Sequence, residues 1–444
     1  MQKKRKQTIF VGLSGGVDSA VSAALLQKQD YDVIGVFIRT WHPDFLECNE
    51  EEERRDAMRV CAHLNIPFLT FDFEDVYKKK VADYMIAEYR AGRTPNPDVM
   101  CNKEVKFGAF LKKALSMGAD YVATGHYARV KLGNTFSREY PTLYRHYSKK
   151  HSPASLNKEN IFQEATGGGV PFRSEARNGV KELREKIFSL QKSPDPLKDQ
   201  SYFLWTLKQG QLNKILFPIG HLKKTKVRKL AKKFKLPVAE KKDSQGICFL
   251  GAVDLKEFLK HYIKEKKGKV INEKREVIGY HDGVAFITLG ERHGFAITKK
   301  SPNDGRYYVV GKDVKKNILV VSQEKNILSG SPRKILLNFR SRLSPSASVA
   351  FHQGCFSLSL NNTNWISKIP EINKNYIAQI RYHGNFLPCQ VKIISKTKAK
   401  VIFAKITMVA PGQSIVIYEK DICLGGGVVV YGLPHIDGTR TLSK

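Results

Sequence analysis

The sequence predicts an α/β protein with an N-terminal parallel-sheet domain, a small mostly-β central domain and a C-terminal β-barrel. In the N-terminal half, short apolar runs alternate with stretches of helical period, which is the rhythm of βαβ units. From Gly268 onward, short apolar or alternating runs are separated by Gly, Asn and Asp, which is typical of all-β domains. Because ligands of open parallel sheets bind at the carboxyl ends of the strands, we expect the chemistry in the N-terminal domain.

Apolar runs and helical periods locate the elements of that domain. Strands are expected at 8–13, 33–41 and 68–73, a further strand and its exit at 121–130, and helices at 51–64 and 74–91. The segment of about 133–196 is rich in Ser, Lys, Asn, Arg and Glu, and little of it is apolar and periodic. We expect an insertion there, either partly disordered with additional nucleic-acid contacts or a tolerated surface insertion. The expected domains are 1–252 (catalytic, with the insertion), 253–327 (central, β-rich) and 328–444 (β-barrel).

The charge of the chain points to a polyanionic partner. Lys and Arg number 75 against 42 Asp and Glu, so the formal net charge is +33. Nucleic acid is the default partner of such an excess, and a merely solvated basic surface is the alternative. The sequence has no apolar run approaching the ~20 residues of a membrane helix and no expected signal peptide, so a cytoplasmic protein is predicted. Its seven cysteines form no C-x-x-C pair, which argues against a disulfide framework or a zinc ribbon.

A glycine-containing turn, Ser14–Ser19, links the first expected strand to a helix. Gly15 and Gly16 permit backbone torsions in which successive N–H groups converge on one anion, and the helix points its positive end at the same place. The phosphate loop of kinases has a Lys after its second glycine, whereas Val17-Asp18 follows here. The turn resembles the pyrophosphate loop of ATP pyrophosphatases, in which Asp18 would bind Mg²⁺ or orient a hydroxyl. The alternative is a tight turn that binds no ligand.

Most cysteines in a reducing compartment are small buried residues, but two in this sequence are candidates for chemistry. Cys101 follows 96–100 (NPDVM) at or just before the expected start of a helix, where the helix dipole lowers the pKa of a thiol. Asp98 lies three residues earlier, from where it could transfer a proton or orient a base. Cys248 lies in the polar loop 243–250. Neither cysteine is expected on the inner face of a regular element, so both are candidate catalytic thiols, with a structural role as the alternative.

Several motifs together are similar to those of the tRNA-specific 2-thiouridylases of the MnmA type. They are, in chain order, SGGVDS (14–19), NPDVMCN (96–102), TGHYAR (124–129), KDQSYFL (198–204), DSQGICFL (243–250), GYHDG (279–283), LGER (289–292) and LGGG (424–427). The resemblance covers nearly the whole chain except the insertion. Several independent motifs in one order are far more specific than the glycine turn alone.

The resemblance implies an enzyme that uses ATP and Mg²⁺ to adenylate the C2 oxygen of the wobble uridine in certain tRNAs. Persulfide sulfur, from a cysteine desulfurase or a sulfur-relay protein, then replaces that oxygen, and AMP and pyrophosphate are released. The resemblance makes Cys248 the persulfide carrier, Cys101 the nucleophile that forms a transient disulfide with it, and Asp98 the acid/base group. The residues it assigns to ATP are Gly12, Leu13, Ser14, Gly15, Gly16, Val17, Asp18, Ser19, Ile38 and Gly125. Those it assigns to tRNA are Asn96, Pro97, Asp98, Lys198, Asp199, Gln200, Arg381 and Tyr382.

The sequence departs from the family pattern in a few places, and other functions compete. Ile38 stands where Met is expected, and Glu291 and His293 replace a Gln and a basic residue, which bears on a local tRNA contact and not on the chemistry. One rival is another ATP pyrophosphatase, such as a lysidine synthetase or an amide-forming ligase, which needs no paired cysteines. A second is a non-catalytic RNA-binding protein with a relic ATP loop. A third is a sulfur carrier alone, which leaves the glycine turn unexplained.

Overall fold

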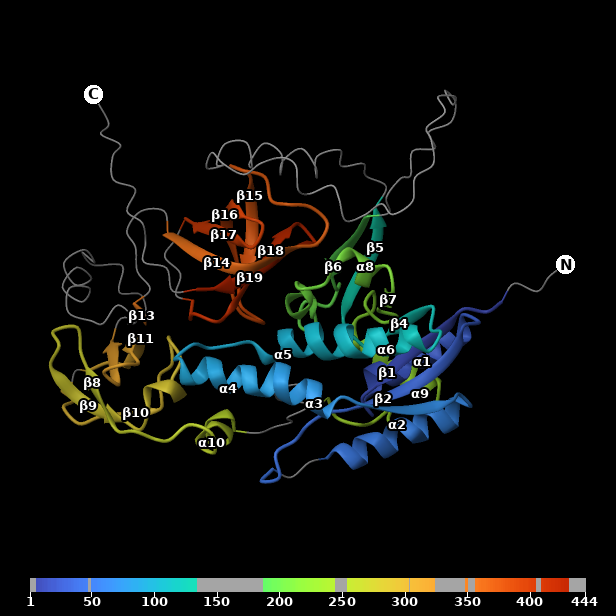
Figure 1. Ribbon diagram of the computed structural model, residues 1–444, viewed down its shortest axis with the longest axis horizontal. Coiled ribbons are helices and arrows are strands. Elements are labelled where there is room, and N and C mark those ends of the chain that lie inside the picture. The colour runs from blue at the N-terminus through green and yellow to red at the C-terminus, as the bar shows by residue number, and fades with distance from the viewer. Residues whose placement is uncertain are drawn as a thin grey trace, which may run out of the picture. The chain divides into compact units, whose positions relative to one another are not determined.

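The structure is a computed structural model of the 444-residue chain (Figure 1). It describes residues 5–46, 49–133, 187–243, 254–302, 304–323, 348–349, 356–404 and 409–430. The chain divides into two compact units, one formed by 1–131 with 188–444 and the other by 132–187. No helix among the described residues combines the length and the apolar character that crossing a membrane requires.

A five-stranded parallel sheet in the order β3-β2-β1-β4-β7 organises the N-terminal domain, as predicted. Its strands are β1 (Thr8–Leu13), β2 (Asp32–Arg39), β3 (Phe68–Asp72), β4 (Tyr121–Ala123) and β7 (Ile215–Leu216). The central strand β1 is apolar throughout its length because helices cover both faces of a parallel sheet. The stretch 121–130, predicted as a strand and its exit, contains strand β4 and the start of a second strand that was not predicted. β4 ends at Ala123, and a separate strand begins at Ala128, because the intervening Gly125 turns the chain against the start of the first helix.

Helices surround this sheet at the predicted places. Those of the first half are α1 (Val17–Lys28), α2 (Glu50–Leu64), α3 (Glu74–Tyr77), the π-helical η1 (Lys78–Ala82), α4 (Asp83–Arg90), α5 (Pro97–Met100), the π-helical η2 (Cys101–Phe110) and α6 (Leu111–Ser116). The 3₁₀ helix η3 (Ser201–Leu204), α8 (Gln209–Leu212), α9 (Lys224–Lys233) and α10 (Leu255–Lys260) follow. Helix α9 is amphipathic, and its Val227 and Ala231 are fully buried against Val21 of α1.

The central domain is built on a six-stranded mixed sheet in the order β10-β9-β8-β12-β11-β13. Its elements are β8 (Gly268–Ile271), β9 (Val277–His281), the 3₁₀ helix η4 (Val284–Phe286), β10 (Phe295–Ile297), β11 (Tyr308–Asp313), β12 (Ile318–Ser322) and β13 (Ser348–Val349). One face of this sheet forms a separate hydrophobic core. The prediction of a small, mostly-β domain here is confirmed.

The C-terminal strands form a closed antiparallel β-barrel, also as predicted. Its strands are β14 (Phe356–Trp365), β15 (Asn375–Gln379), β16 (Phe386–Ser395), β17 (Lys398–Phe403), β18 (Ser414–Glu419) and β19 (Ile422–Val429). The barrel closes because β14 pairs with β17 on one side and with β19 on the other. Two further strands, β6 (Ile187–Lys192) and β5 (Ala128–Gly133), extend the same sheet beyond β19.

The predicted insertion of 133–196 is too long at its C-terminal end. Ile187–Lys192 is strand β6, which pairs with β19, and its Leu190 is fully buried. This strand was missed because its partner lies far away in the sequence. The rest of the insertion, 134–186, lies outside the described residues, as do the domain boundaries predicted near 252 and 327. The three predicted domain ranges therefore stay a prediction.

Candidate active site

The glycine turn closes on itself between β1 and α1. The backbone N–H of Ser14 donates to Ser19 Oγ at 3.2 Å, and Ser19 Oγ donates to the Gly16 carbonyl at 3.1 Å. Gly15 has φ +67°, and a Cβ there would lie 2.4 Å from the Glu53 carbonyl oxygen, so only glycine fits. No side chain caps the start of α1, and Ser14 is exposed beside it. This geometry leaves the positive end of a 12-residue helix open to an anionic ligand.

A second turn, which follows β4, forms the neighbouring wall of the site. A Cβ on Gly125 would lie 2.7 Å from Ser19 N, so this turn packs directly on the first residues of α1. A Cβ on Gly12 would lie at ordinary contact distance from the Phe110 ring (3.6 Å), the Thr124 side chain (3.7 Å) and the Ala123 carbonyl oxygen (3.8 Å). The side chain of Ile38, at the end of β2, is buried with the hydrophobic core. The residues predicted to contact ATP thus lie at the carboxyl edge of adjacent strands, where the fold class places ligands.

Asp18, the predicted Mg²⁺ ligand, is held by a lysine and a tyrosine that the sequence did not identify. Lys224 Nζ lies 2.8 Å from both carboxylate oxygens of Asp18, and Tyr127 Oη donates to Oδ1 at 2.7 Å. Burial, followed by the charge of Asp18, raises the pKa of Tyr127 far above its usual value, so this phenol stays a donor. In the sequence, Lys224 is one of several basic residues in and around α9, and no motif singles it out. The one sequence signal that separates Lys224 from the neighbouring lysines is its position as the first residue of helix α9.

The same lysine connects the glycine turn to the segment that carries Cys248. Lys224 Nζ is also 2.8 Å from Asp243 Oδ1, Lys198 Nζ donates to Asp243 Oδ2 at 2.7 Å, and Arg228 donates to Oδ1. Burial raises the pKa of Asp243, but the hydrogen bonds from Lys198 and Lys224 outweigh burial and hold that pKa far below its usual range. Asp243 therefore stays ionised. It is the last described residue before 244–253, so Cys248 itself lies outside the described residues.

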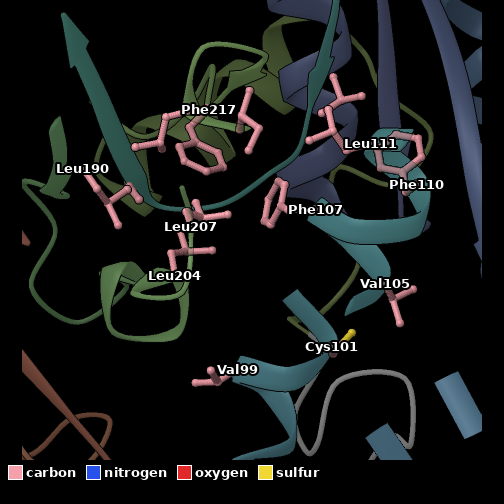
Figure 2. Close-up of a cluster of buried hydrophobic side chains, with 14 of the residues drawn as sticks. Val99, Cys101, Val105, Phe107, Phe110, Leu111, Leu190, Leu204, Leu207 and Phe217 are labelled. Carbon is pink, nitrogen blue, oxygen red and sulfur yellow. The ribbon is translucent and has the colours of Figure 1, made fainter. Parts of the chain in front are cut away.

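Cys101 occupies a different position from the predicted one. The helix begins at Pro97, where Asn96 Oδ1 accepts from Val99 N at 3.1 Å, so Cys101 lies beyond the first turn. Its side chain is only 1% exposed and belongs to a hydrophobic core cluster, so the expectation that it avoids the inner face of an element is wrong. Figure 2 shows its sulfur between Val99 and Val105, on the ribbon that leads to Phe107. The helix start was misplaced because the Asn-Pro pair, and not the later apolar period, fixes the N-terminus.

The segment predicted to face the target base lies beside a group of aromatic rings. Asn96 hydrogen-bonds to Tyr202, and the Phe203 ring lies 4.4 Å from that of Tyr382 between centroids. Burial raises the pKa of Tyr382 to about 12, and the charges of Asp199 and Asp98 act in the same direction. The predicted base-facing residues and the predicted tRNA contact Tyr382 are thus brought together, with Arg381 exposed next to them.

Two predicted tRNA contacts have their side chains engaged inside the protein. Gln200 Oε1 accepts from Tyr127 N at 2.9 Å. The Asp199 carboxylate accepts from Ser193 N at 2.9 Å and from Ser201 Oγ at 2.9 Å. These side chains fix the segment that follows β6 and help to place Tyr127. Their assignment to tRNA stays a prediction.

Basic residues of the central domain line a pocket of about 710 Å³. They are Arg292, His293, Lys300 and Arg306, and Asp304 and Tyr307 contribute to the same wall. Glu291, one of the residues that depart from the family pattern, does not line this pocket and interacts with the buried Lys312. Burial lowers the pKa of Lys312 to about 8, and the charge of Glu291 acts in the opposite direction. Lys312 is only 1% exposed, and its ammonium donates to the Ile287 carbonyl at 2.6 Å. The charge of Glu291 thus partly compensates the positive charge of this buried lysine.

The fold and the site together define the class of this chain. A parallel sheet, a glycine turn without the kinase lysine and an acidic residue at the start of the following helix make it an ATP pyrophosphatase-type enzyme with two added β domains. Residues 7–152 and 174–252 match the family model described as the tRNA methyl transferase HUP domain. Residues 256–323 match the tRNA methyl transferase PRC-barrel domain, and 356–429 match the aminomethyltransferase beta-barrel domain.

Curated relatives identify the family. The chain is 39% identical over 434 residues to the tRNA-specific 2-thiouridylase MnmA of Geobacillus thermodenitrificans, covering 97% of this chain and 96% of that protein. It is 38% identical over 437 residues to the same-named protein of Buchnera aphidicola, covering 97% and 99% of the two chains. A solved 4-thiouridine synthetase–RNA complex with bound ATP aligns with 15% identity and a TM-score of 0.28 over 57% of this chain and 50% of that one. The chain belongs to the MnmA family of tRNA-specific 2-thiouridylases.

Proposed function

We propose that this chain makes 2-thiouridine at the wobble position of tRNA, with ATP and a persulfide as co-substrates. The uridine C2 oxygen attacks the α-phosphate of ATP, and pyrophosphate leaves. The terminal sulfur of a Cys248 persulfide then attacks C2, and AMP leaves with the original oxygen. Cys101 attacks the Cys248 sulfur, which frees the 2-thio group and leaves a Cys101–Cys248 disulfide. A dithiol reductant restores both thiols.

The observation that carries the proposal is the shared lysine. Lys224 lies 2.8 Å from Asp18 in the glycine turn and 2.8 Å from Asp243, which leads directly into the segment with Cys248. Such a link suits an enzyme in which nucleotide cleavage and sulfur delivery act on one base. The other ATP pyrophosphatases considered above have no need to bring a cysteine segment to the nucleotide.

The residues around Asp18 fit a nucleotide with bound Mg²⁺. Mg²⁺ prefers carboxylate and phosphate oxygens, so the Asp18 carboxylate would hold the ion, which would supply positive charge beside the phosphates. Lys224 adds a positive charge at the same place, and Tyr127 orients Asp18 through its 2.7 Å hydrogen bond. The N–H groups at the start of α1 would hold the departing pyrophosphate.

On the tRNA side, the base must leave its stack before any group can reach C2. The partly exposed rings of Phe203 and Tyr382 lie beside Asn96–Asp98 and suit the stacking of an extruded pyrimidine, while the buried Tyr202 supports them from within the protein. Asp98 would accept or return a proton there. The pocket lined by Arg292, Lys300 and Arg306 would receive backbone phosphates of the same tRNA.

Mass spectrometry of tRNA nucleosides tests the proposal. Incubation of the protein with tRNA, ATP, Mg²⁺ and a persulfide source should yield 2-thiouridine, with no product when ATP is omitted. Cys248→Ser and Cys101→Ala should abolish the product while leaving ATP binding intact. Full turnover by Cys248→Ser would favour a lysidine synthetase or ligase. Absence of pyrophosphate release from the complete mixture would favour an RNA-binding protein with a relic loop.

A further inference from the structure

Thr94, two residues before the predicted base-facing segment, is held from both added domains at once. Its backbone N–H donates to the Pro411 carbonyl at 2.7 Å, and its carbonyl accepts from Gln413 Nε2 at 3.0 Å. Its hydroxyl donates to Thr288 Oγ1 of the central domain at 3.3 Å. Thr94 is 8% exposed. A short loop between α4 and α5 is thereby fixed by residues nearly 200 and over 300 positions away.

The partner segment, Val409–Gln413, touches all three domains within a few residues. Val409 belongs to the core of the β-barrel, whereas the next residue, Ala410, belongs to the core of the central domain. Gly412 then packs on Thr94 with φ +91°, and a Cβ there would lie 2.8 Å from the Thr94 carbonyl oxygen. The N–H of Gly412 donates to the Val429 carbonyl at 2.9 Å, which ties the segment to β19.

The chain between Thr94 and the active site is stiff. Pro95 and Pro97 each fix their own φ and restrict the residue before them to extended conformations. Asn96, which lies between them, has φ −116° and ψ 95° and caps the helix that carries Asp98 and then Cys101. A displacement of Thr94 is therefore passed to Asp98 and Cys101 and is not absorbed by the intervening bonds.

We propose that Thr94, Gly412 and Gln413 form a positioning clamp that makes the placement of Asp98 and Cys101 depend on how the central domain and the barrel are seated. The catalytic roles of Asp98 and Cys101 come from the proposed function, whereas the contacts that form the clamp do not depend on it. A binding event on either β domain that shifts Val409–Gln413 would shift the catalytic segment with it.

Gly412→Ala and Gly118→Ala form a matched pair for that test. Both glycines have positive φ, +91° and +89°, so an alanine costs similar backbone strain at each. A Cβ on Gly118 meets nothing within 4 Å, whereas one on Gly412 pushes on Thr94. Gly412→Ala should lower kcat for 2-thiouridine formation about 10- to 100-fold with unchanged tRNA and ATP affinity, and Gly118→Ala should keep kcat. Equal losses in the two variants, or a loss of tRNA affinity that accounts for the defect, would overturn the clamp.

If Gly412→Ala does not fold, Gln413→Met tests the clamp in its place. This change removes the amide that donates to the Thr94 carbonyl and keeps the length of the side chain. The readout is the rate of thiol alkylation at Cys101 relative to Cys61, each 1% exposed and both in the N-terminal domain. Gln413→Met should lower kcat and raise the Cys101/Cys61 labelling ratio, whereas general destabilisation raises both rates together. An unchanged ratio with unchanged kcat would refute the clamp. If the wild type makes no 2-thiouridine, the proposed function fails, and the labelling ratio still decides whether the clamp holds the segment.

Discussion

Lys224 supplies the positive charge that the carboxylates of Asp18 and Asp243 share, at 2.8 Å from each. Replacing it with methionine leaves the Asp18 carboxylate without its lysine partner beside the phosphates of ATP, whereas Asp243 keeps Lys198 and Arg228. Lys224→Met should therefore lower kcat/KM for ATP about 100- to 1,000-fold, with KM for ATP raised. Pyrophosphate release in the presence of tRNA measures the effect.

Lys226→Met is the matched control, because Lys226 lies on the same helix α9 with its side chain exposed. It should keep the turnover of the wild type. Lys224→Arg keeps the charge and should retain part of the activity. If Lys224→Met and Lys226→Met behave alike, Lys224 is only one more basic residue on the surface of α9.

Glu291 and Lys312 give the central domain a distinct pH dependence. Burial lowers the pKa of Lys312 to about 8, from 10.5, and Glu291 opposes that shift. In Glu291→Gln, the folded-state pKa of Lys312 falls further, so the wild type has the higher folded-state pKa of the two. The stability that Glu291 contributes is therefore present in full only below the lower Lys312 pKa of the variant, and it is lost as the pH rises through the wild-type value of about 8.

The measurement is the free energy of unfolding of wild type and Glu291→Gln at pH 7 and pH 9.5. The variant should be less stable by about 1 kcal/mol at pH 7, and the difference should shrink at pH 9.5. A difference that is the same at both pH values would show that Glu291 acts through packing or hydrogen bonding and not through the charge of Lys312.

At the scale of elements, the helix that carries Cys101 owes its start to Asn96. Its side-chain oxygen accepts from Val99 N at 3.1 Å, and Pro97 occupies the first helical position. Asn96→Ala removes this cap at a cost of about 1 kcal/mol, so the first turn should fray. Hydrogen–deuterium exchange of the peptide that covers 97–110 should accelerate. Asn96→Asp keeps the oxygen acceptor and should preserve protection, and fraying in both variants would mean that the cap is not what fixes the start.

The elements that sequence reasoning found are those defined by local patterns. β1, the glycine turn and α1 were predicted together because the apolar run, the two glycines and the helical period are contiguous. β6 was missed because its six residues acquire their role only by pairing with β19, more than 200 positions away. The burial of Cys101 and the pairing of Asp18 with Lys224 were missed for the same reason, since both depend on tertiary contacts. Motif resemblance located the candidate site, but not the side chains that hold it together.

For the whole molecule, the formal net charge of +33 sets how tRNA should bind. Each Lys or Arg that neutralises a phosphate releases counterions, so the affinity should fall steeply as salt rises. What distinguishes this chain from a uniformly basic surface is the pocket that gathers Arg292, Lys300 and Arg306 in the central domain. If tRNA phosphates bind in this pocket, removing its arginines should change the salt dependence of tRNA binding more than removing basic residues elsewhere.

Arg292→Ala/Arg306→Ala should weaken tRNA binding and reduce the slope of log K against log salt by about 2, roughly one for each phosphate contact removed. The control is Lys112→Ala/Lys113→Ala, which removes the same charge from two exposed positions within α6. It should leave the slope unchanged, because long-range attraction from exposed charges is largely screened beyond about 10 Å at 0.1 M salt. Equal changes of slope in both double variants would show that the excess charge acts as a diffuse field. A flat salt response of the wild type would refute a footprint on the tRNA backbone altogether. The slope therefore separates a built phosphate site from a merely basic protein, and it does so without reference to the thiolation chemistry.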